Sequence, residues 1–245
     1  MKEDQNSHTF SREEMRMLAR ERIAEITKEF TEGFKFLEDY PKSVTFFGSS
    51  LMNQDNPYCV SARELSGRIA KELGYSVFTG GGPGIMEAAN RGAFESGGTS
   101  LALTIKLPDP QTINKYITKE VDPYYFFVRK VCLSFSAEAF VFYPGGLGTL
   151  DEFFEIMTLI QTRKIVGVPL ICVGSDYWKS LERFMQSELL SRGTILPEDL
   201  LLYHITDNHD EIIDLIRKSP VRESIPLHLD AEIPTEGGAP HAETV

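Results

Sequence analysis

Two glycine-rich turns, each between an expected strand and an expected helix, constrain this chain more than any other feature. The first, Gly80–Gly84, follows the apolar run Ser76–Thr79, and the second, Pro144–Gly148, follows Ala139–Tyr143. Glycines at such a junction let the backbone approach a phosphate closely, and the next helix offers unpaired N–H groups. A single turn of this kind equally fits a tight connection, but two at equivalent positions favour phosphate binding.

Apolar β-type runs and helical stretches alternate from Val44 to Lys218. We expect strands at 44–47, 76–79, 100–105, 139–143, 170–173 and 201–205, and helices at 61–73, 85–96, 124–135, 150–162, 177–191 and 210–218, with a looser segment at 107–123. This alternation predicts an α/β fold with a doubly wound parallel sheet covered on both faces. Such sheets bind ligands at the carboxyl ends of their strands, which is where both glycine turns lie.

Three regions are expected along the chain. Residues 1–40 form a charged helical extension, in which Ser11 and Glu14 have the spacing of a capping box. Residues 41–218 form the α/β domain, and 219–245 form a disordered tail rich in proline and glycine. An oligomerisation role for the N-terminal helix is a hypothesis, because its apolar stripe fits packing on its own domain equally well.

Composition narrows the class of partner. The net charge is −11, which argues against nucleic acid or an anionic membrane. A mononucleotide stays possible, because backbone N–H groups and one arginine suffice to hold a single phosphate. Three widely spaced cysteines favour a reducing compartment, and no apolar run approaches the roughly 18 residues that span a bilayer. We expect a soluble, cytoplasmic protein.

The common nucleotide fingerprints do not match. In the dinucleotide pattern G-x-G-x-x-G, the position of the third glycine is occupied by Glu87 in the first turn and by Asp151 in the second. The P-loop pattern is absent. The sequence therefore lacks the main feature expected of an NAD-dependent oxidoreductase. The five histidines form no cluster with metal-ligand spacing, so we expect neither a metal site nor a cofactor.

Two charged side chains near the second turn are candidates for chemistry. Thr149 and Glu152 have capping-box spacing, so Glu152 could simply cap its helix. A carboxylate in a first helical turn is also expected to stay ionised, and beside a bound ribose phosphate it could stabilise an oxocarbenium-like transition state or orient water. Arg129, in the basic pair with Lys130, is either a solvated side chain or a bidentate phosphate ligand.

The two turns resemble those of a known family. Residues 144–152, Pro-Gly-Gly-Leu-Gly-Thr-Leu-Asp-Glu, match the P-G-G-x-G-T-x-x-E motif of the LOG family, also called lysine decarboxylase-like. Arg129-Lys130 matches the family's R-K pair, with thirteen residues between Lys130 and Pro144, and 80–90 resembles its first glycine turn. The similarity covers about residues 43–218.

This resemblance implies a Rossmann-like fold, a homodimer or higher homo-oligomer, and hydrolysis of nucleoside 5′-monophosphates to free base and ribose 5-phosphate. The substrates implied are AMP-like or cytokinin riboside monophosphates. Arg129 and Glu152 would be the catalytic pair. The implied substrate-binding residues are Gly48, Ser49, Gly81, Gly82, Gly84, Glu87, Lys130, Gly145, Gly146, Leu147, Gly148, Thr149 and Thr158. Glu87 and water are candidates for the acid that protonates the leaving base.

Departures from the family pattern leave the base preference open. The segment 109–116 offers Gln111 and Asn114 where plant-type members carry a substrate-contacting Glu, and Glu138 stands in place of a common Asp. Decarboxylation would need a lysine bound to pyridoxal phosphate, and Lys130 fits phosphate binding better. The rival function is a non-catalytic nucleotide or molybdenum-cofactor carrier of the same fold, which would gain nothing from a carboxylate beside a phosphate.

Overall fold

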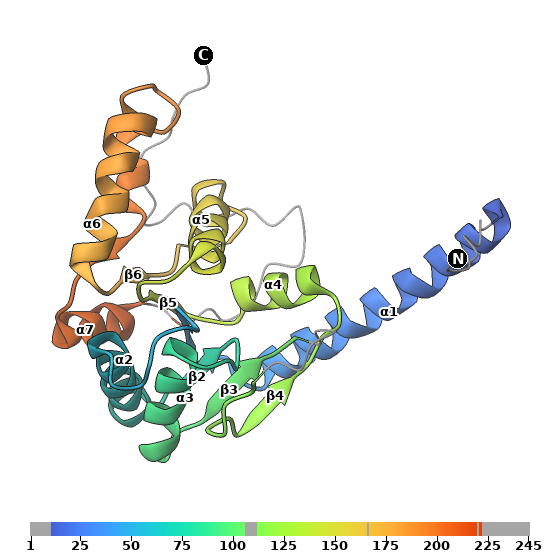
Figure 1. Cartoon of the computed structure of the whole chain (residues 1–245), viewed down its shortest axis with the longest axis horizontal. Helices are drawn as coiled ribbons and strands as arrows, with labels where there is room; N and C mark the ends of the chain where they lie inside the picture. Colours follow the sequence, from blue (N-terminus) through green and yellow to red (C-terminus); the bar gives the residue numbers. More distant parts are fainter. Residues whose placement is uncertain (1–10, 106–111, 166, 220, 222–245) are drawn as a thin grey trace, which may run out of the picture.

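The computed structural model describes residues 11–105, 112–165, 167–219 and 221, and a parallel sheet forms its centre. Within these residues seven strands lie in the order β4-β3-β2-β1-β5-β6-β7, and every neighbouring pair is parallel (Figure 1). The strands are β1 (Ser43–Phe47), β2 (Ser76–Thr79), β3 (Ser100–Leu103), β4 (Lys119–Val121), β5 (Ala139–Phe142), β6 (Leu170–Cys172) and β7 (His204–Ile205).

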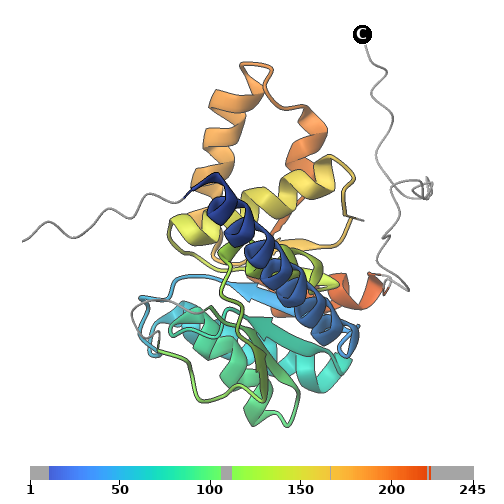
Figure 2. The ribbon, with the colours of Figure 1, turned by 90° about the vertical axis from the view of Figure 1, so that its right-hand side faces the viewer.

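Helices cover both faces of this sheet (Figure 2). One face packs against α2 (Pro57–Arg68), α3 (Ile85–Glu95) and α7 (His209–Lys218). The other face packs against α1 (Arg12–Glu38), α4 (Phe126–Phe135), α5 (Leu147–Gln161) and α6 (Ser175–Phe184). Three short turns complete the chain: π-helical η1 (Ile69–Leu73) and η2 (Met185–Leu190), and the 3₁₀ turn η3 (Pro197–Leu201).

The central strand shows why two layers form. Successive side chains of a strand point to opposite faces. Val44 and Phe46 of β1 therefore enter the core beneath α2 and α3, while Phe47 enters the core beneath α4 and α5. Since all five residues of β1 are buried, the strand reads as one apolar run, as is typical of a parallel sheet. The predicted doubly wound, Rossmann-like sheet with helices on both faces is confirmed.

Most predicted elements lie within a few residues of their predicted bounds, and the exceptions have local causes. Helix α2 begins at Pro57 rather than Ser61, because the Asn56 side chain accepts a hydrogen bond from the Tyr58 N–H (2.9 Å) and proline suits the first helical position. The strand predicted at 201–205 shortens to His204–Ile205, because η3 occupies the preceding residues.

Strand β4 was not predicted. It lies within the segment expected to be loose, pairs with β3 at the edge of the sheet, and leaves Lys119 and Glu120 exposed. A three-residue edge strand with charged side chains carries no apolar signal, so only its partner reveals it.

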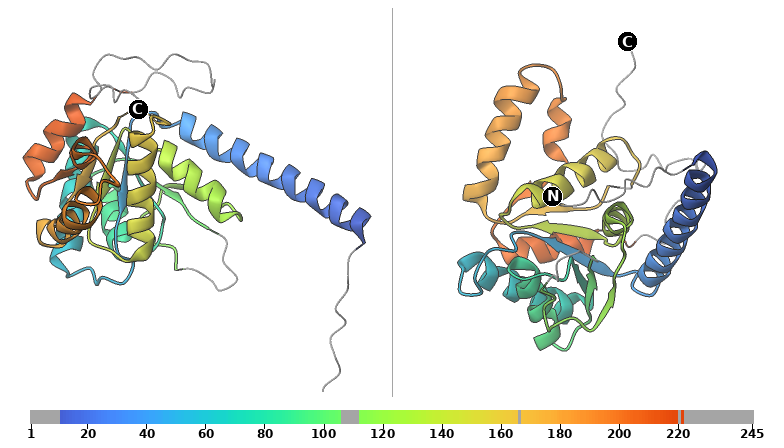
Figure 3. Two further views of the ribbon diagram at one scale, coloured as in Figure 1. Left: turned by 90° about the horizontal axis from the view of Figure 1, so that it is seen from above. Right: turned by 45° about the vertical axis from the view of Figure 1, so that its right-hand side comes forward.

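The N-terminal helix is a single element that leaves the domain. The Ser11–Glu14 capping box is confirmed, with hydrogen bonds in both directions between the two residues (2.8 and 3.2 Å). The C-terminal half of α1 packs against α4 and β4, and the N-terminal half extends past the sheet (Figure 3). The division into 1–40, 41–218 and 219–245 remains a prediction, and of the tail only Ser219 and Val221 lie within the described residues.

Candidate functional site

The two glycine turns lie on either side of the central strand. The first follows β2 and the second follows β5, and these two strands are the neighbours of β1. The chain builds the sheet outward from β1 through β2, β3 and β4, then crosses back to β5 on the other side of β1 and continues outward through β6 and β7. The topological switch point therefore lies between β1 and β5, with the second turn at it and the first turn on the far side of β1. Open α/β sheets bind ligands at this place, outside the carboxyl ends of the strands.

Ser49, in the loop after β1, joins the two turns. Its N–H donates to the carbonyl of Pro144 (3.1 Å), and its own carbonyl accepts from the N–H of Ile85 (3.0 Å). Glycine is required on both sides. A Cβ at Gly84 would overlap the Ser49 carbonyl, and one at Gly145 would lie 3.0 Å from the Ser49 nitrogen. The backbone of 48–49 thus fixes the spacing between the turns.

The first turn is held by a buried polar network. Gly81 has φ +77°, and the Thr79 hydroxyl accepts a hydrogen bond from its N–H (2.9 Å). The Asn114 amide donates to the carbonyls of Gly81 (3.1 Å) and Gly82 (3.2 Å) and to the side-chain oxygen of Asn90 (2.9 Å). Asn114 is buried by these contacts, so it braces the turn and is no counterpart of the family's substrate-contacting Glu. Gln111 lies outside the described residues.

The second turn opens a helix earlier than predicted. Helix α5 begins at Leu147, with Gly146 as its N-cap residue and no side-chain hydrogen bond at the cap. Gly146 and Gly148 are exposed, and Leu147 is 87% exposed. Thr149 is buried in the first turn, and its side chain lies against Gly145. A helix start without a side-chain cap leaves backbone N–H groups that an anion can bind.

Because α5 starts at Leu147, Glu152 lies in its second turn. The prediction that Glu152 could cap the helix together with Thr149 is wrong, since Thr149 is itself helical and Gly146 occupies the cap. The capping-box spacing predicts a helix that starts after the glycines of the motif, whereas the helix begins at Leu147 and includes Gly148.

Glu152 is a buried carboxylate with one unpaired oxygen. It is 6% exposed, and its Oε2 has no hydrogen-bond partner among the described residues. Burial raises its pKa to about 7, although the nearby positive charges of Arg129 and Lys130 act in the opposite direction. The expectation that the helix dipole keeps this group fully ionised at neutral pH is therefore wrong, because the loss of hydration dominates.

Arg129 lies between the first turn and the charge of Glu152. It lies on α4, its Nε donates to the carbonyl of Leu103 at the end of β3 (2.8 Å), and its Nη2 lies against Gly80. Burial lowers its pKa, whereas the negative charge of Glu152 raises it. One edge of the guanidinium is thus fixed to the backbone, and the group lies within electrostatic reach of Glu152.

Lys130 is held by carboxylates in this structure. Its ammonium group forms ion pairs with Asp151 (2.7 Å) and Glu155 (2.8 Å), both on α5. These pairs lock α4 to α5 on either side of Glu152. Its assignment as a phosphate ligand stays a prediction, and a phosphate would compete with both carboxylates for it.

Two predicted site residues lie apart from this arrangement. Thr158 is exposed on α5, and six residues at about 100° each turn it away from the buried side that carries Glu152. Glu87 is partly buried in the first turn of α3, where its charge acts on Cys59 of α2. The roles of both stay predictions. Sequence reasoning missed the Leu103 carbonyl, for which a sequence carries no signal.

Other classes of site find no support within the described residues. No group of three or more His, Cys, Asp or Glu side chains there is arranged to hold a metal ion. The cysteines Cys59, Cys132 and Cys172 are buried and free. No helix in the described ranges combines the length and apolar character needed to cross a membrane.

The chain is similar to several known proteins. A family model described as "Possible lysine decarboxylase" matches residues 86–216, more than half of the chain. A cytokinin riboside 5′-monophosphate phosphoribohydrolase of Rhodococcoides fascians is 29% identical over 123 residues, which are 48% of this chain and 61% of that protein. This chain therefore spans less than two thirds of that relative. A probable enzyme of the same name from Oryza sativa subsp. japonica is 25% identical over 197 residues, covering 77% of this chain and 87% of that protein.

Solved structures share the fold. The X-ray structure of TM1055, a structural genomics target, is 25% identical with a TM-score of 0.54 and covers 72% of this chain and 98% of its own. The molybdenum cofactor carrier protein of Chlamydomonas reinhardtii is 22% identical with a TM-score of 0.54 and covers 72% of this chain and 96% of its own. The second likeness concerns the fold alone.

Proposed function

This chain belongs to the family described as possible lysine decarboxylases, the LOG family, and we propose that it is a nucleoside 5′-monophosphate phosphoribohydrolase. It would hydrolyse the N-glycosidic bond of an AMP-like or cytokinin riboside monophosphate, giving free base and ribose 5-phosphate. Curated relatives carry this activity in their names. The observation that carries the proposal is the buried carboxylate of Glu152, one oxygen of which lacks a hydrogen-bond partner, within electrostatic reach of Arg129.

The second glycine turn supplies the phosphate site in this proposal. The exposed start of α5, Gly146–Gly148, presents backbone N–H groups and the positive end of the helix dipole. Gly145 and the loop at 48–49 line the same edge of the sheet, and Ser49 keeps the first turn next to it. The phosphate then anchors the ribose above Glu152.

The reaction adds one water to the bond between the ribose C1′ and the base nitrogen. As this bond breaks, positive charge grows on C1′, and the ionised Glu152 stabilises it or takes a proton from the attacking water. The hydroxyl of the water ends on C1′, and the water's one remaining proton, taken up by Glu152 or by solvent, is passed on to the nitrogen of the leaving base. Arg129, fixed through Leu103, positions the phosphate or ribose so that C1′ lies over the carboxylate.

The family's older description suits these residues less well. A lysine that forms a Schiff base needs its amine free to attack a carbonyl, whereas the Lys130 ammonium group is engaged in ion pairs with Asp151 and Glu155. A buried glutamate with a pKa near 7 instead matches the demands of glycosidic hydrolysis at neutral pH.

Product analysis tests the proposal. AMP, GMP, CMP, UMP and a cytokinin riboside monophosphate would each be incubated with the wild type and with Glu152→Gln, and the products separated by chromatography. We expect free base and ribose 5-phosphate from the wild type, and a loss of about a thousandfold or more in the variant. Glu155→Gln is the matched control, because Glu155 lies one turn further along α5 and pairs with Lys130.

Nucleotide binding without release of any base would overturn the enzymatic proposal and favour a carrier, the role named for the structural neighbour from Chlamydomonas. An equal loss of activity in both variants would instead remove Glu152 from the reaction.

A further inference from the structure

A tyrosine of α6 reaches the second glycine turn. The hydroxyl of Tyr177 donates a hydrogen bond to the carbonyl of Gly145 (2.9 Å), although the two residues are 32 positions apart in the chain. The Tyr177 ring is partly buried on the core that α5 and α6 cover, and it lies edge-on to Trp178 with 5.1 Å between the ring centroids. Its hydroxyl is therefore delivered to the turn by a packed side chain.

This hydrogen bond fixes the direction of one peptide unit. In a trans peptide the C=O of one residue and the N–H of the next point in opposite directions, and the described residues contain no cis peptide bond. Because the Gly145 carbonyl points to Tyr177, the N–H of Gly146 points away from α6. Within the described ranges this N–H has no hydrogen-bond partner, and Gly146 is the N-cap residue of α5. Tyr177 thus orients an unused donor at the edge where we place the phosphate.

The peptide unit needs an external hold because glycines flank it on both sides. Glycine adopts positive and negative φ about equally, so the backbone offers little resistance to a half-turn of the peptide between residues 145 and 146. Gly146 has φ −90°, and nothing lies within 4 Å of a Cβ built on it. After such a rotation a carbonyl oxygen would stand in place of the N–H and would repel a phosphate.

Tyr177 is itself held firmly, because α6 begins at a tightly packed glycine. Gly174, the N-cap residue of α6, has φ +98°, and an added Cβ there would lie 2.8 Å from the Pro144 ring. The Asp207 carboxylate accepts hydrogen bonds from the N–H groups of Gly174 (2.6 Å) and Ser175 (3.1 Å). The start of α6 is thereby fixed against Pro144, the residue that opens the second glycine turn.

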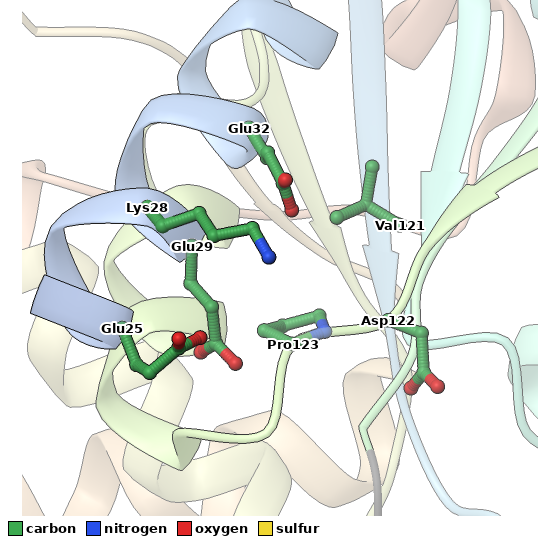
Figure 4. A pocket seen from close by; sticks show the side chains of 7 residues that line it. All are labelled: Glu25, Lys28, Glu29, Glu32, Val121, Asp122 and Pro123. Atoms are coloured by element: carbon green, nitrogen blue, oxygen red, sulfur yellow. The ribbon is translucent and has the colours of Figure 1, made fainter. Parts of the chain in front are cut away.

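A hollow elsewhere in the molecule does not compete for the phosphate. It lies between α1 and the segment 121–123 and has a volume of about 140 Å³ (Figure 4). Four carboxylates and one lysine line it: Glu25, Glu29, Glu32, Asp122 and Lys28. An anion would be repelled by this excess of negative charge, whereas the start of α5 offers N–H groups.

We propose that Tyr177 is a positioning residue for the phosphate, because it holds the Gly145 carbonyl so that the N–H of Gly146 faces the bound anion. This role rests on the proposed function, which takes the start of α5 as the site of the substrate's phosphate. Tyr177 acts through the backbone and touches neither the substrate nor the reacting bond. Its loss should therefore weaken the binding of any ligand that carries this phosphate and leave the chemical step largely unchanged.

Tyr177→Phe in the full-length chain removes the hydroxyl and keeps the ring. The Gly145 carbonyl then faces an apolar ring edge, so the rotated peptide, in which this carbonyl turns toward water, gains population. Apparent affinity falls in proportion to the population of the binding-competent state. We expect KM for the best nucleotide and the dissociation constant of ribose 5-phosphate to rise about tenfold, with kcat changing by less than about twofold.

Tyr203→Phe is the matched control. The Tyr203 hydroxyl donates to Glu182 of the same helix (3.4 Å) rather than to the glycine turn. The urea midpoints of the two variants should fall by similar small amounts, as measured by circular dichroism. KM should rise only in Tyr177→Phe, and this difference separates a positioning role from general destabilisation.

The peptide can also be observed directly. In protein labelled with ¹⁵N-glycine, the amide signal of Gly146 is identified by its absence from the spectrum of Gly146→Ala. Titration with inorganic phosphate should shift this signal in the wild type and in Tyr203→Phe. In Tyr177→Phe the same concentrations should shift it only weakly, because the N–H no longer faces the anion.

An unchanged dissociation constant of ribose 5-phosphate in Tyr177→Phe would overturn the positioning role, and so would equal rises of KM in the two tyrosine variants. A fall in kcat at constant KM would also overturn it, because the tyrosine would then act on the chemical step. If the wild type releases no base, the proposed function fails alone, since the phosphate titration still reports on Tyr177. If the wild type binds neither ribose 5-phosphate nor inorganic phosphate, the positioning role fails too.

Discussion

The two glycine turns hold equivalent places in the sheet, yet they are built in opposite ways. In the first, Gly81 and Gly82 are buried and their carbonyls accept hydrogen bonds from Asn114. In the second, Gly146 and Gly148 are exposed at the start of an uncapped helix. The first turn therefore serves as a brace that fixes Arg129 and Ser49, and the second is free to meet a ligand. Substitutions in the first should cost stability, and those in the second should cost activity.

Arg129 lies against the first turn and acts electrostatically on Glu152, and its loss should have the largest effect. Arg129→Gln removes a cation beside Glu152 and the fork expected to position the substrate. We expect kcat/KM for the best nucleotide to fall about a hundred- to a thousandfold. The acidic limb of the pH–rate profile should also move to higher pH, because a positive charge that lowers the pKa of Glu152 is gone. If activity falls but the acidic limb stays at the same pH, the charge of Arg129 does not lower the pKa of Glu152.

Gly84→Ala probes the brace, with a large effect on stability. Gly84 has φ +69° and ψ −128°, and a methyl group there would overlap the Ser49 carbonyl. The free energy of unfolding should fall by roughly 3 kcal/mol. Urea titration followed by circular dichroism measures this. A decrease of less than about 1 kcal/mol would show that the close approach of Gly84 to the Ser49 carbonyl is not needed for stability.

The titration of Glu152 gives the next effect. Its pKa is raised from 4.5 to about 7 in the folded chain, so the folded state binds the proton more tightly than the unfolded state does. Stability from this group is complete below pH 4.5 and is lost as the pH rises to about 7. Relative to Glu152→Gln, the wild type should lose roughly 2–3 kcal/mol of unfolding free energy across this window. If the unfolding free energies of the two proteins depend on pH in the same way, the Glu152 carboxylate is well solvated in the folded chain.

Asn114→Ala should cost less and leave catalysis intact. Three hydrogen bonds from its amide would be lost, so we expect about 2 kcal/mol of destabilisation. The buried Gly82 carbonyl would lose this donor, whereas the Gly81 carbonyl would keep its hydrogen bond from the backbone N–H of residue 114 (2.9 Å). KM for the nucleotide should stay within about twofold, because the side chain acts within the brace. If KM rises tenfold while stability is unchanged, Asn114 contacts the substrate rather than bracing the turn.

The sequence was informative where local patterns decide structure. The positions of Arg129 and Glu152, and both turns, followed from motifs at predicted strand ends. Strand β4 could not be predicted because its residues Lys119–Val121 gain their structure only from the neighbouring β3. The start of α5 at Leu147 was missed because Gly148 suggests a loop, whereas the helix contains it. The raised pKa of Glu152 depends on burial by distant segments, which spacing along the chain does not encode.

Gly146→Ala should have the smallest effect on stability and so sharpens the contrast with Gly84. Gly146 has φ −90° and ψ −159°, which any residue adopts, and nothing lies within 4 Å of an added Cβ. The free energy of unfolding should change by less than about 0.5 kcal/mol. In the proposed site, however, the methyl group would stand where phosphate meets the start of α5, so KM should rise severalfold while kcat changes little. If KM stays constant, the phosphate does not bind at this turn, and the exposed glycines of 146–148 would need a different explanation.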